Sequence, residues 1–108
     1  MRAQGLTRSS YLFRWAGLTQ CRLLHRQGRH EELFRTLDGE EAAARTLGDR
    51  PLLAALLLVR AEATAATNDL PAAGRALLGA AELGVAANPE LQGHFNLSVG
   101  RVLELAHV

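Results

Sequence analysis

Apolar residues are densest over residues 52–66, where the chain reads LLAALLLVRAEATAA. Only Arg60, Glu62 and Thr64 interrupt this run. At about 100° per residue, the leucines and alanines fall on every side of a helix rather than on one stripe. A helix that is apolar all round has to be buried on several sides. The pattern therefore predicts a central helix around which the rest of the chain packs.

Turn-forming residues divide the chain into five predicted helices. Gly28, Gly48 and Asn68 suit the left-handed turn that follows a helix. Asp49 and Asp69 suit the cap of the next helix, and a proline follows each of them in the first turn, where its missing N–H does no harm. The predicted helices cover about residues 7–27, 30–47, 49–67, 69–86 and 88–106.

The second predicted helix contains Asp38-Gly39, which could also form a turn. Leu33, Leu37 and Ala44 keep one helical period across this dipeptide, so we expect a continuous helix. Helices joined by such short turns must pack mostly as antiparallel neighbours. The expected fold class is therefore all-α, with five helices in one domain.

Turn residues recur at a spacing of 40 residues, since Gly28 is followed by Asn68, and Gly48 by Asn88. Helix pairs that repeat every 34 to 47 residues or so are typical of solenoids. We therefore predict a single helical-repeat domain over residues 1–108. Its first repeat covers about residues 7–47, its second about 49–86, and a half repeat or cap about 88–107.

Small and large residues also recur at matching positions of the two copies. They are Cys21, Gly28, Leu33 and Leu37 in the first copy, and Ala61, Asn68, Ala73, Leu77 and Ala80 in the second. This pattern resembles the tetratricopeptide repeat family, particularly the longer-period form of large bacterial transcriptional activators and signal-transducing ATPases. The resemblance covers about residues 14–106, and Glu40, Arg60 and Thr64 depart from it. It implies antiparallel hairpins stacked as a right-handed solenoid, and an adaptor that binds a peptide or another domain in the groove lined by the first helix of each pair.

Length and composition limit the class of protein. A chain of 108 residues can bury enough surface to fold without a metal ion or a disulfide. A single cysteine, Cys21, cannot form an internal disulfide, so nothing indicates an oxidising compartment. The longest apolar run, of eight residues, is far shorter than the ~20 needed to cross a bilayer. We expect a cytoplasmic protein that does not insert into membranes.

The sequence lacks the usual catalytic signatures, such as a glycine-rich phosphate loop, HExxH or a Ser/His/Asp set in strand context. Cys21 and His25 are one helical turn apart, but two ligands do not make a zinc site and no second pair completes one. We interpret them as a small buried thiol beside a partly exposed imidazole. We expect no enzymatic activity, no cofactor and no metal.

Positive charge is concentrated at the start of the chain. Residues 1–30 hold six arginines and no acid, whereas residues 31–108 hold six arginines and eleven acids. On the first helix, arginines and aromatic residues share an arc of about 120°. This arginine stripe consists of Arg8, Tyr11, Arg14, Trp15, Arg22, Arg26 and Arg29, with Leu18 inside the same arc and Leu6, Leu12, Phe13, Ala16, Leu23 and Leu24 opposite.

The arginine stripe has three interpretations. It can dock an acidic protein partner, or it can neutralise phosphates and stack on bases. It can also be a solvated face with Tyr11 and Trp15 lying under the arginine stems. We predict a protein–protein interaction scaffold, regulatory or part of a larger regulator, with a protein or peptide as its partner. The alternative is a small nucleic-acid-binding protein that uses the stripe, and an enzyme ranks third.

The last predicted helix has apolar residues outside its main apolar face. Leu97, Leu105 and Val108 lie off the face formed by Leu91, Phe95, Val99, Val102, Leu103 and Ala106. Solenoid repeats bury such faces against a neighbouring repeat. The pattern predicts a homodimer that forms with rising concentration, or a segment of a longer array.

Overall fold

The computed structural model describes residues 11–84 and 89–106, which form five helices and no strand. The helices are α1 (Tyr11–Arg26), α2 (His30–Leu47), α3 (Arg50–Ala66), α4 (Leu70–Glu82) and α5 (Pro89–Ala106). The predicted all-α class is thus confirmed, and the predicted start of the first helix near residue 7 lies outside the described residues. Within these residues, no helix has both the length and the apolar character of a membrane span.

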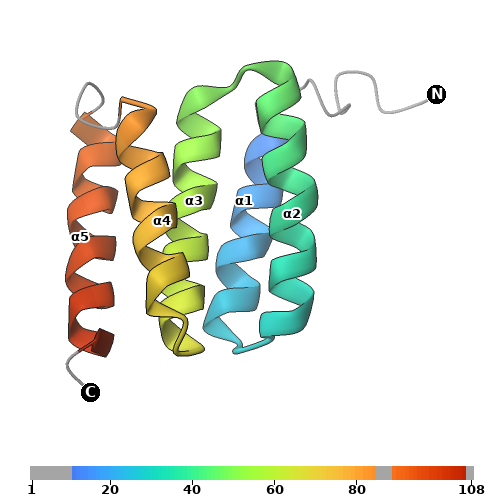
Figure 1. The fold of residues 1–108 in the computed structure, drawn as a ribbon. Coiled ribbons are helices and arrows are strands. Elements are labelled where there is room, and N and C mark those ends of the chain that lie inside the picture. The colour runs from blue at the N-terminus through green and yellow to red at the C-terminus, as the bar shows by residue number, and fades with distance from the viewer. Residues whose placement is uncertain (1–10, 85–88, 107–108) are drawn as a thin grey trace.

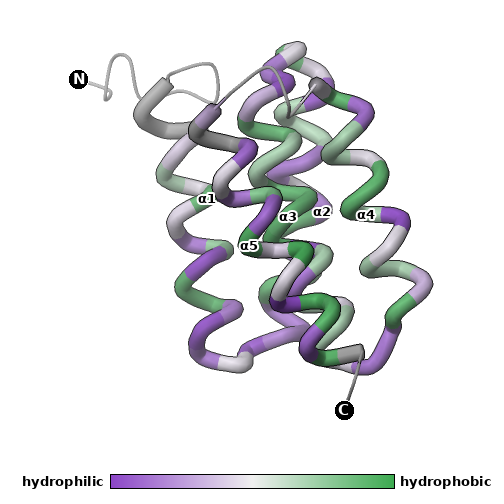
Figure 2. Tube along the Cα trace, turned by 90° about the vertical axis from the view of Figure 1, so that its left-hand side faces the viewer, coloured by the Kyte–Doolittle hydropathy of each residue, from purple (hydrophilic) through white to green (hydrophobic). Residues whose placement is uncertain are grey.

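The helices stand side by side and run antiparallel to their neighbours in the chain (Figure 1). α1 packs against α3, and α3 packs against α5, so these three helices form one side of the molecule (Figures 1 and 2). On the other side, α2 packs against α1 and α3, and α4 packs against α3 and α5. Since α1, α3 and α5 are alternate helices of the chain, they run parallel to one another.

α3 is the central helix that its all-round apolar pattern predicted. It contacts each of the other four helices. Every residue from Leu52 to Val59 is buried, with at most 8% of its surface exposed. Burying a leucine stabilises a fold by about 1.5–3 kcal/mol relative to leaving it in water. This segment therefore supplies much of the free energy that holds the helices together.

The predicted turns and caps are confirmed at each of the first three connections. Gly28, Gly48 and Asn68 adopt left-handed backbone conformations, with φ of 73°, 72° and 69°. The side chains of Asp49 and Asp69 each accept a hydrogen bond from a backbone N–H in the first turn of the next helix, at 3.2 Å. α2 continues through Asp38-Gly39, also as predicted.

Two details of the sequence prediction are wrong. The fourth helix ends at Glu82 and not near residue 86, because Gly84 takes the left-handed conformation that terminates it, with φ of 86°. Leu103 was expected on the buried face of α5, but 56% of its surface is exposed. α5 turns Ser98 and Val102 towards the interior instead, and Leu103 follows Val102 by one residue and so points about 100° away.

Alanine dominates the contact between α3 and α4. A cluster of buried residues there consists of Ala61, Ala65, Ala73, Ala76 and Val102. Further along α4, a Cβ added to Gly79 would lie 3.3 Å from the Cδ1 atom of Leu57. The two helices therefore approach closely, as small residues at a helix crossing permit. We call this cluster the alanine seam.

Candidate functional site

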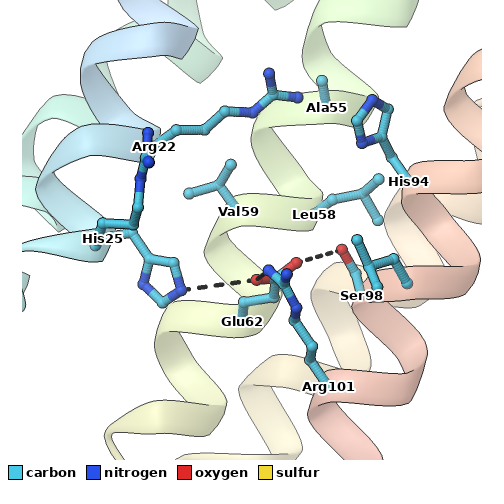
Figure 3. Close-up of a pocket in the computed structure, with 11 residues that line it drawn as sticks. Arg22, His25, Ala55, Leu58, Val59, Glu62, His94, Ser98 and Arg101 are labelled. Atoms are coloured by element: carbon cyan, nitrogen blue, oxygen red, sulfur yellow. Dashed lines mark hydrogen bonds and ion pairs between the residues drawn. The ribbon is translucent and has the colours of Figure 1, made fainter.

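A pocket of about 370 Å³ opens between α1, α3 and α5 (Figure 3). We call it the α1/α3/α5 pocket. α3 supplies the floor, formed by the buried side chains of Ala55, Leu58 and Val59. The remaining lining residues are Arg22, His25 and Arg26 from α1, Glu62 from α3, and His94, Leu97, Ser98 and Arg101 from α5.

Helical spacing explains why these side chains meet. Residues three and four positions apart lie on the same face of a helix. Arg22, His25 and Arg26 follow this spacing on α1, and the lining residues of α3 and α5 repeat it on their own helices. Since the three helices lie beside one another in parallel, their three faces form one continuous lining.

Glu62 connects the three helices that line the pocket. Its carboxylate accepts a hydrogen bond of 2.5 Å from Ser98 Oγ and one of 3.1 Å from Arg101 Nη1, both on α5. His25 Nε2 on α1 lies 3.7 Å from the same carboxylate (Figure 3). We call His25, Glu62, Ser98 and Arg101 the Glu62 cluster.

The Glu62 cluster determines the charge of its carboxylate. Only 13% of the Glu62 side chain is exposed. This burial opposes ionisation, but the nearby His25 and the hydrogen bonds from Ser98 and Arg101 outweigh it and lower the pKa of Glu62 to about 2. Glu62 is therefore ionised at neutral pH, and its charge is balanced within the cluster.

The α1 side of the pocket carries uncompensated positive charge. Arg22 and Arg26 are exposed, and neither forms an ion pair with any residue that the structure describes. Among the described residues, Glu62 is the only carboxylate that lines the pocket, and it is already paired with Arg101. The pocket thus offers an apolar floor beside two arginines that lack an anionic partner.

A second charged cluster lies between α2 and α3 and has a structural role. Arg60 Nη2 lies 2.6 Å from Asp38 Oδ1, and Arg60 Nε lies 2.7 Å from Glu41 Oε2. The guanidinium also lies over the Phe34 ring, 5.9 Å from its centre. Arg60 therefore joins α3 to α2, which gives this charged interruption of a buried helix a structural role. The hydroxyl of Thr64 donates to the Arg60 backbone oxygen at 2.8 Å.

The structure divides the predicted arginine stripe. Arg22 and Arg26 line the pocket, but Arg29 forms an ion pair with Glu32 on α2. Trp15 is half-buried and packs against the hydrophobic core. Arg8 lies outside the described residues, as do the side chains of Tyr11 and Arg14, whose backbone belongs to α1.

The predicted orientation of the first helix is partly wrong. Leu18 was placed inside the solvated arc, yet only 1% of its surface is exposed. Leu23 was placed on the apolar side, yet 47% of its surface is exposed. The reason is that α1 packs against both α2 and α3, so its buried face centres on Leu18, Cys21 and Leu24.

Sequence reasoning missed the pocket residues of α3 and α5. Glu62 is recognisable only as a charged interruption of a buried helix. His94, Ser98 and Arg101 carry a weak signal, because they are polar residues at helical spacing on a helix that otherwise has an apolar face. Their meeting with α1 depends on the packing of helices that are far apart in the sequence.

The predicted character of Cys21 and His25 is confirmed. Cys21 is fully buried and His25 is partly exposed. Burial, followed by the charges of Glu40 and Glu41, raises the pKa of the Cys21 thiol to about 11. A thiol in this state is a poor nucleophile and metal ligand at neutral pH. In the described part of the chain, no three His, Cys, Asp or Glu side chains gather as a possible metal site.

Comparisons with known proteins do not place the chain in a family. No family model matches it, and no curated protein or solved structure matches it either. The chemistry of the α1/α3/α5 pocket is therefore the basis on which a function can be proposed.

Proposed function

We propose that the protein is an interaction scaffold, a tetratricopeptide-like stack of helical hairpins that binds a peptide segment of a partner protein in the α1/α3/α5 pocket. One observation supports this proposal: all the described residues that line the pocket belong to α1, α3 and α5, the first helices of successive hairpins. This is the groove in which the resemblance to tetratricopeptide repeats implies ligand binding. A role in a larger bacterial regulator follows from the same resemblance.

The size and rigidity of the pocket suit a peptide. Its volume of about 370 Å³ lies at the small end of the range for ligand sites, roughly 300–1,000 Å³. It can hold a few side chains but not a folded domain. Its floor belongs to the most buried helix of the molecule, and a preformed site spends little free energy on ordering itself when a ligand binds.

The Glu62 cluster favours binding over catalysis. His25, Glu62 and His94 are titratable groups that line one pocket, as an active site would require. However, hydrogen bonds from Ser98 and Arg101 occupy the carboxylate, and its lowered pKa makes it a weak proton acceptor at neutral pH. The carboxylate therefore serves to hold α1, α3 and α5 in register.

Trp15 weakens the nucleic-acid alternative. A protein that binds single strands without sequence preference needs exposed aromatic rings on which bases stack. Trp15 packs against the core, and Leu18 in the same arc is buried. Among the described residues of this face, Trp15 therefore does not offer the exposed ring that a stacking platform requires.

Selection from a display library of random peptides tests the proposal. We expect enriched peptides to bind the protein in solution, as measured by fluorescence anisotropy. Leu97 lines the pocket with 53% of its surface exposed, so Leu97→Gln should weaken binding roughly tenfold through loss of an apolar contact. Leu78 on α4 is the matched control, because it is 60% exposed and lies outside the pocket.

Two results would overturn the proposed function. One is a selection that enriches no peptide. The other is equal binding of the enriched peptides to the Leu97→Gln and Leu78→Gln variants, which would place the peptide elsewhere on the molecule. Thermal melting of both variants confirms that neither change disturbs the fold.

A further inference from the structure

We infer that the pocket selects an acidic peptide segment, in which a carboxylate side chain binds between α1 and α5 and a neighbouring aliphatic side chain lies on the floor. The inference rests on the proposed function, since it names the class of peptide. Arg22 and Arg26 from α1 supply the positive charge, and these two residues and His94 from α5 supply N–H donors for the carboxylate. Ala55, Leu58 and Val59 receive the aliphatic side chain.

The first observation behind this inference is the positive charge on the α1 side of the pocket. Arg22 and Arg26 are four residues apart on α1, and like charges at this spacing repel each other. Neither has an ion-pair partner among the described residues. Glu62 pairs with neither of them, and Arg101 already balances the charge of its carboxylate. An anionic ligand would supply the missing counter-charge.

The second observation is the direction in which the Arg22 and His94 side chains extend. Figure 3 shows the Arg22 side chain reaching from α1 across the pocket towards Ala55, and the His94 ring extending from α5 at the same end. Both side chains are exposed, so their N–H groups can reach a ligand. A carboxylate placed between them would accept a charge-assisted hydrogen bond from the guanidinium and another bond from the imidazole.

The apolar floor distinguishes a peptide from a simple anion. Ala55, Leu58 and Val59 lie directly beside the arginines, and Leu97 adds an exposed apolar group on the α5 rim. Inorganic phosphate or a nucleic-acid backbone would neutralise the arginines but would leave Leu97 in water and the floor without an apolar contact. A segment that combines Asp or Glu with Leu, Ile or Val complements both parts of the pocket.

The experiment analyses the peptides that the display selection enriches. We expect Asp or Glu next to an aliphatic residue in their consensus. A fluorescein-labelled copy of the strongest binder is then titrated with the wild-type protein and with the double variant Arg22→Gln/Arg26→Gln. Loss of both cations should weaken binding roughly tenfold or more, because the charge-assisted hydrogen bonds to the ligand carboxylate are lost.

Two controls separate pocket contacts from general charge. The variant Arg35→Gln/Arg75→Gln removes two exposed arginines of α2 and α4 that do not line the pocket, and it should bind within about twofold of the wild type. A peptide in which Asn and Gln replace Asp and Glu should lose as much affinity for the wild type as the original peptide loses with the pocket variant. Raising the salt concentration should weaken the original peptide more than the amide peptide.

The outcomes distinguish this inference from the proposed function. Neutral peptides that bind the pocket variant and the wild type equally would overturn the acidic class and leave peptide binding intact. A failure to enrich any peptide would overturn both. A labelled single-stranded oligonucleotide that binds more tightly than every peptide, and that loses affinity with Arg22→Gln/Arg26→Gln, would also overturn both and assign the arginines to nucleic acid.

Discussion

Replacing Glu62 with glutamine tests the cluster that ties α1, α3 and α5 together. Glutamine has nearly the size of glutamate and resembles its protonated form, so the change removes the charge and little else. In the native protein the carboxylate binds Ser98 and Arg101 on α5 and lies close to His25 on α1. The substitution therefore reports how much the ionised cluster stabilises the fold.

The lowered pKa of Glu62 sets the expected magnitude. The carboxyl pKa falls from an ordinary 4.5 to about 2 in the folded protein, which corresponds to about 3 kcal/mol of favourable interaction with the ionised form. Because the folded-state pKa is the lower one, this contribution is fully present above pH 4.5 or so. It is lost as the pH falls through the interval from 4.5 to about 2. We expect Glu62→Gln to lower the free energy of unfolding by about 2–3 kcal/mol at neutral pH.

The free energy of unfolding is measured by urea unfolding followed by circular dichroism. The measurement is repeated from neutral pH down to the lowest pH at which the protein is still folded. The free energies of unfolding of wild type and variant are compared at each pH, because the other carboxyl groups contribute equally to both proteins. Glu82→Gln is the matched control, since Glu82 is exposed at the end of α4. This control should change the free energy of unfolding by no more than about 0.5 kcal/mol.

Two results would refute the reasoning about Glu62. A loss of stability that is equally large in acid and at neutral pH would show that the ionised form is not the stabilising one. A Glu62→Gln variant as stable as the Glu82→Gln control at neutral pH would show that the cluster contributes nothing to folding.

Four further predictions follow from the packing. Leu57→Asp should unfold the domain, because it buries an unpaired charge where only 8% of the side chain is exposed, whereas circular dichroism of Leu78→Asp should remain helical. Cys21, with its pKa raised to about 11, should react with a maleimide no faster than the protein opens, and rapid labelling without denaturant would contradict its burial. Asp69→Ala should cost about 1 kcal/mol in urea unfolding, because the cap of α4 loses its hydrogen bond to Ala72, and an unchanged midpoint would count against that bond. Sedimentation velocity should show dimers as the concentration rises into the high micromolar range, and a single monomeric species throughout would disprove the predicted self-association.

The fold could be predicted to the extent that local rules determine it. Gly28, Gly48 and Asn68 were identified because a left-handed turn favours glycine or asparagine whatever surrounds it. Asp69 was identified because a helix start needs an acceptor for its free N–H groups. The burial of α3 was predictable because a helix that is apolar on every side is stable only when other elements cover it. In each case the physical cause lies within a few residues of its effect.

The pocket was not predictable, because its parts come from distant segments. Glu62 and Ser98 are 36 residues apart in the chain and meet only through the packing of α3 against α5. The orientation of α1 was only partly predictable for a related reason: a helical wheel arranges side chains around one axis but does not show which sectors two neighbouring helices cover. Leu18 was therefore placed in the solvated arc, whereas it is buried.

The alanine seam has a consequence for how the pocket can evolve. Alanine has no side-chain rotation to freeze, so the seam forms at almost no cost in side-chain entropy. The same smallness leaves no spare room, and a bulkier residue at Ala73, none of whose surface is exposed, would wedge α4 away from α3 at about 1–3 kcal/mol. Because α3 carries both the seam and the pocket floor, a change in the seam would shift the floor, although no seam residue lines the pocket.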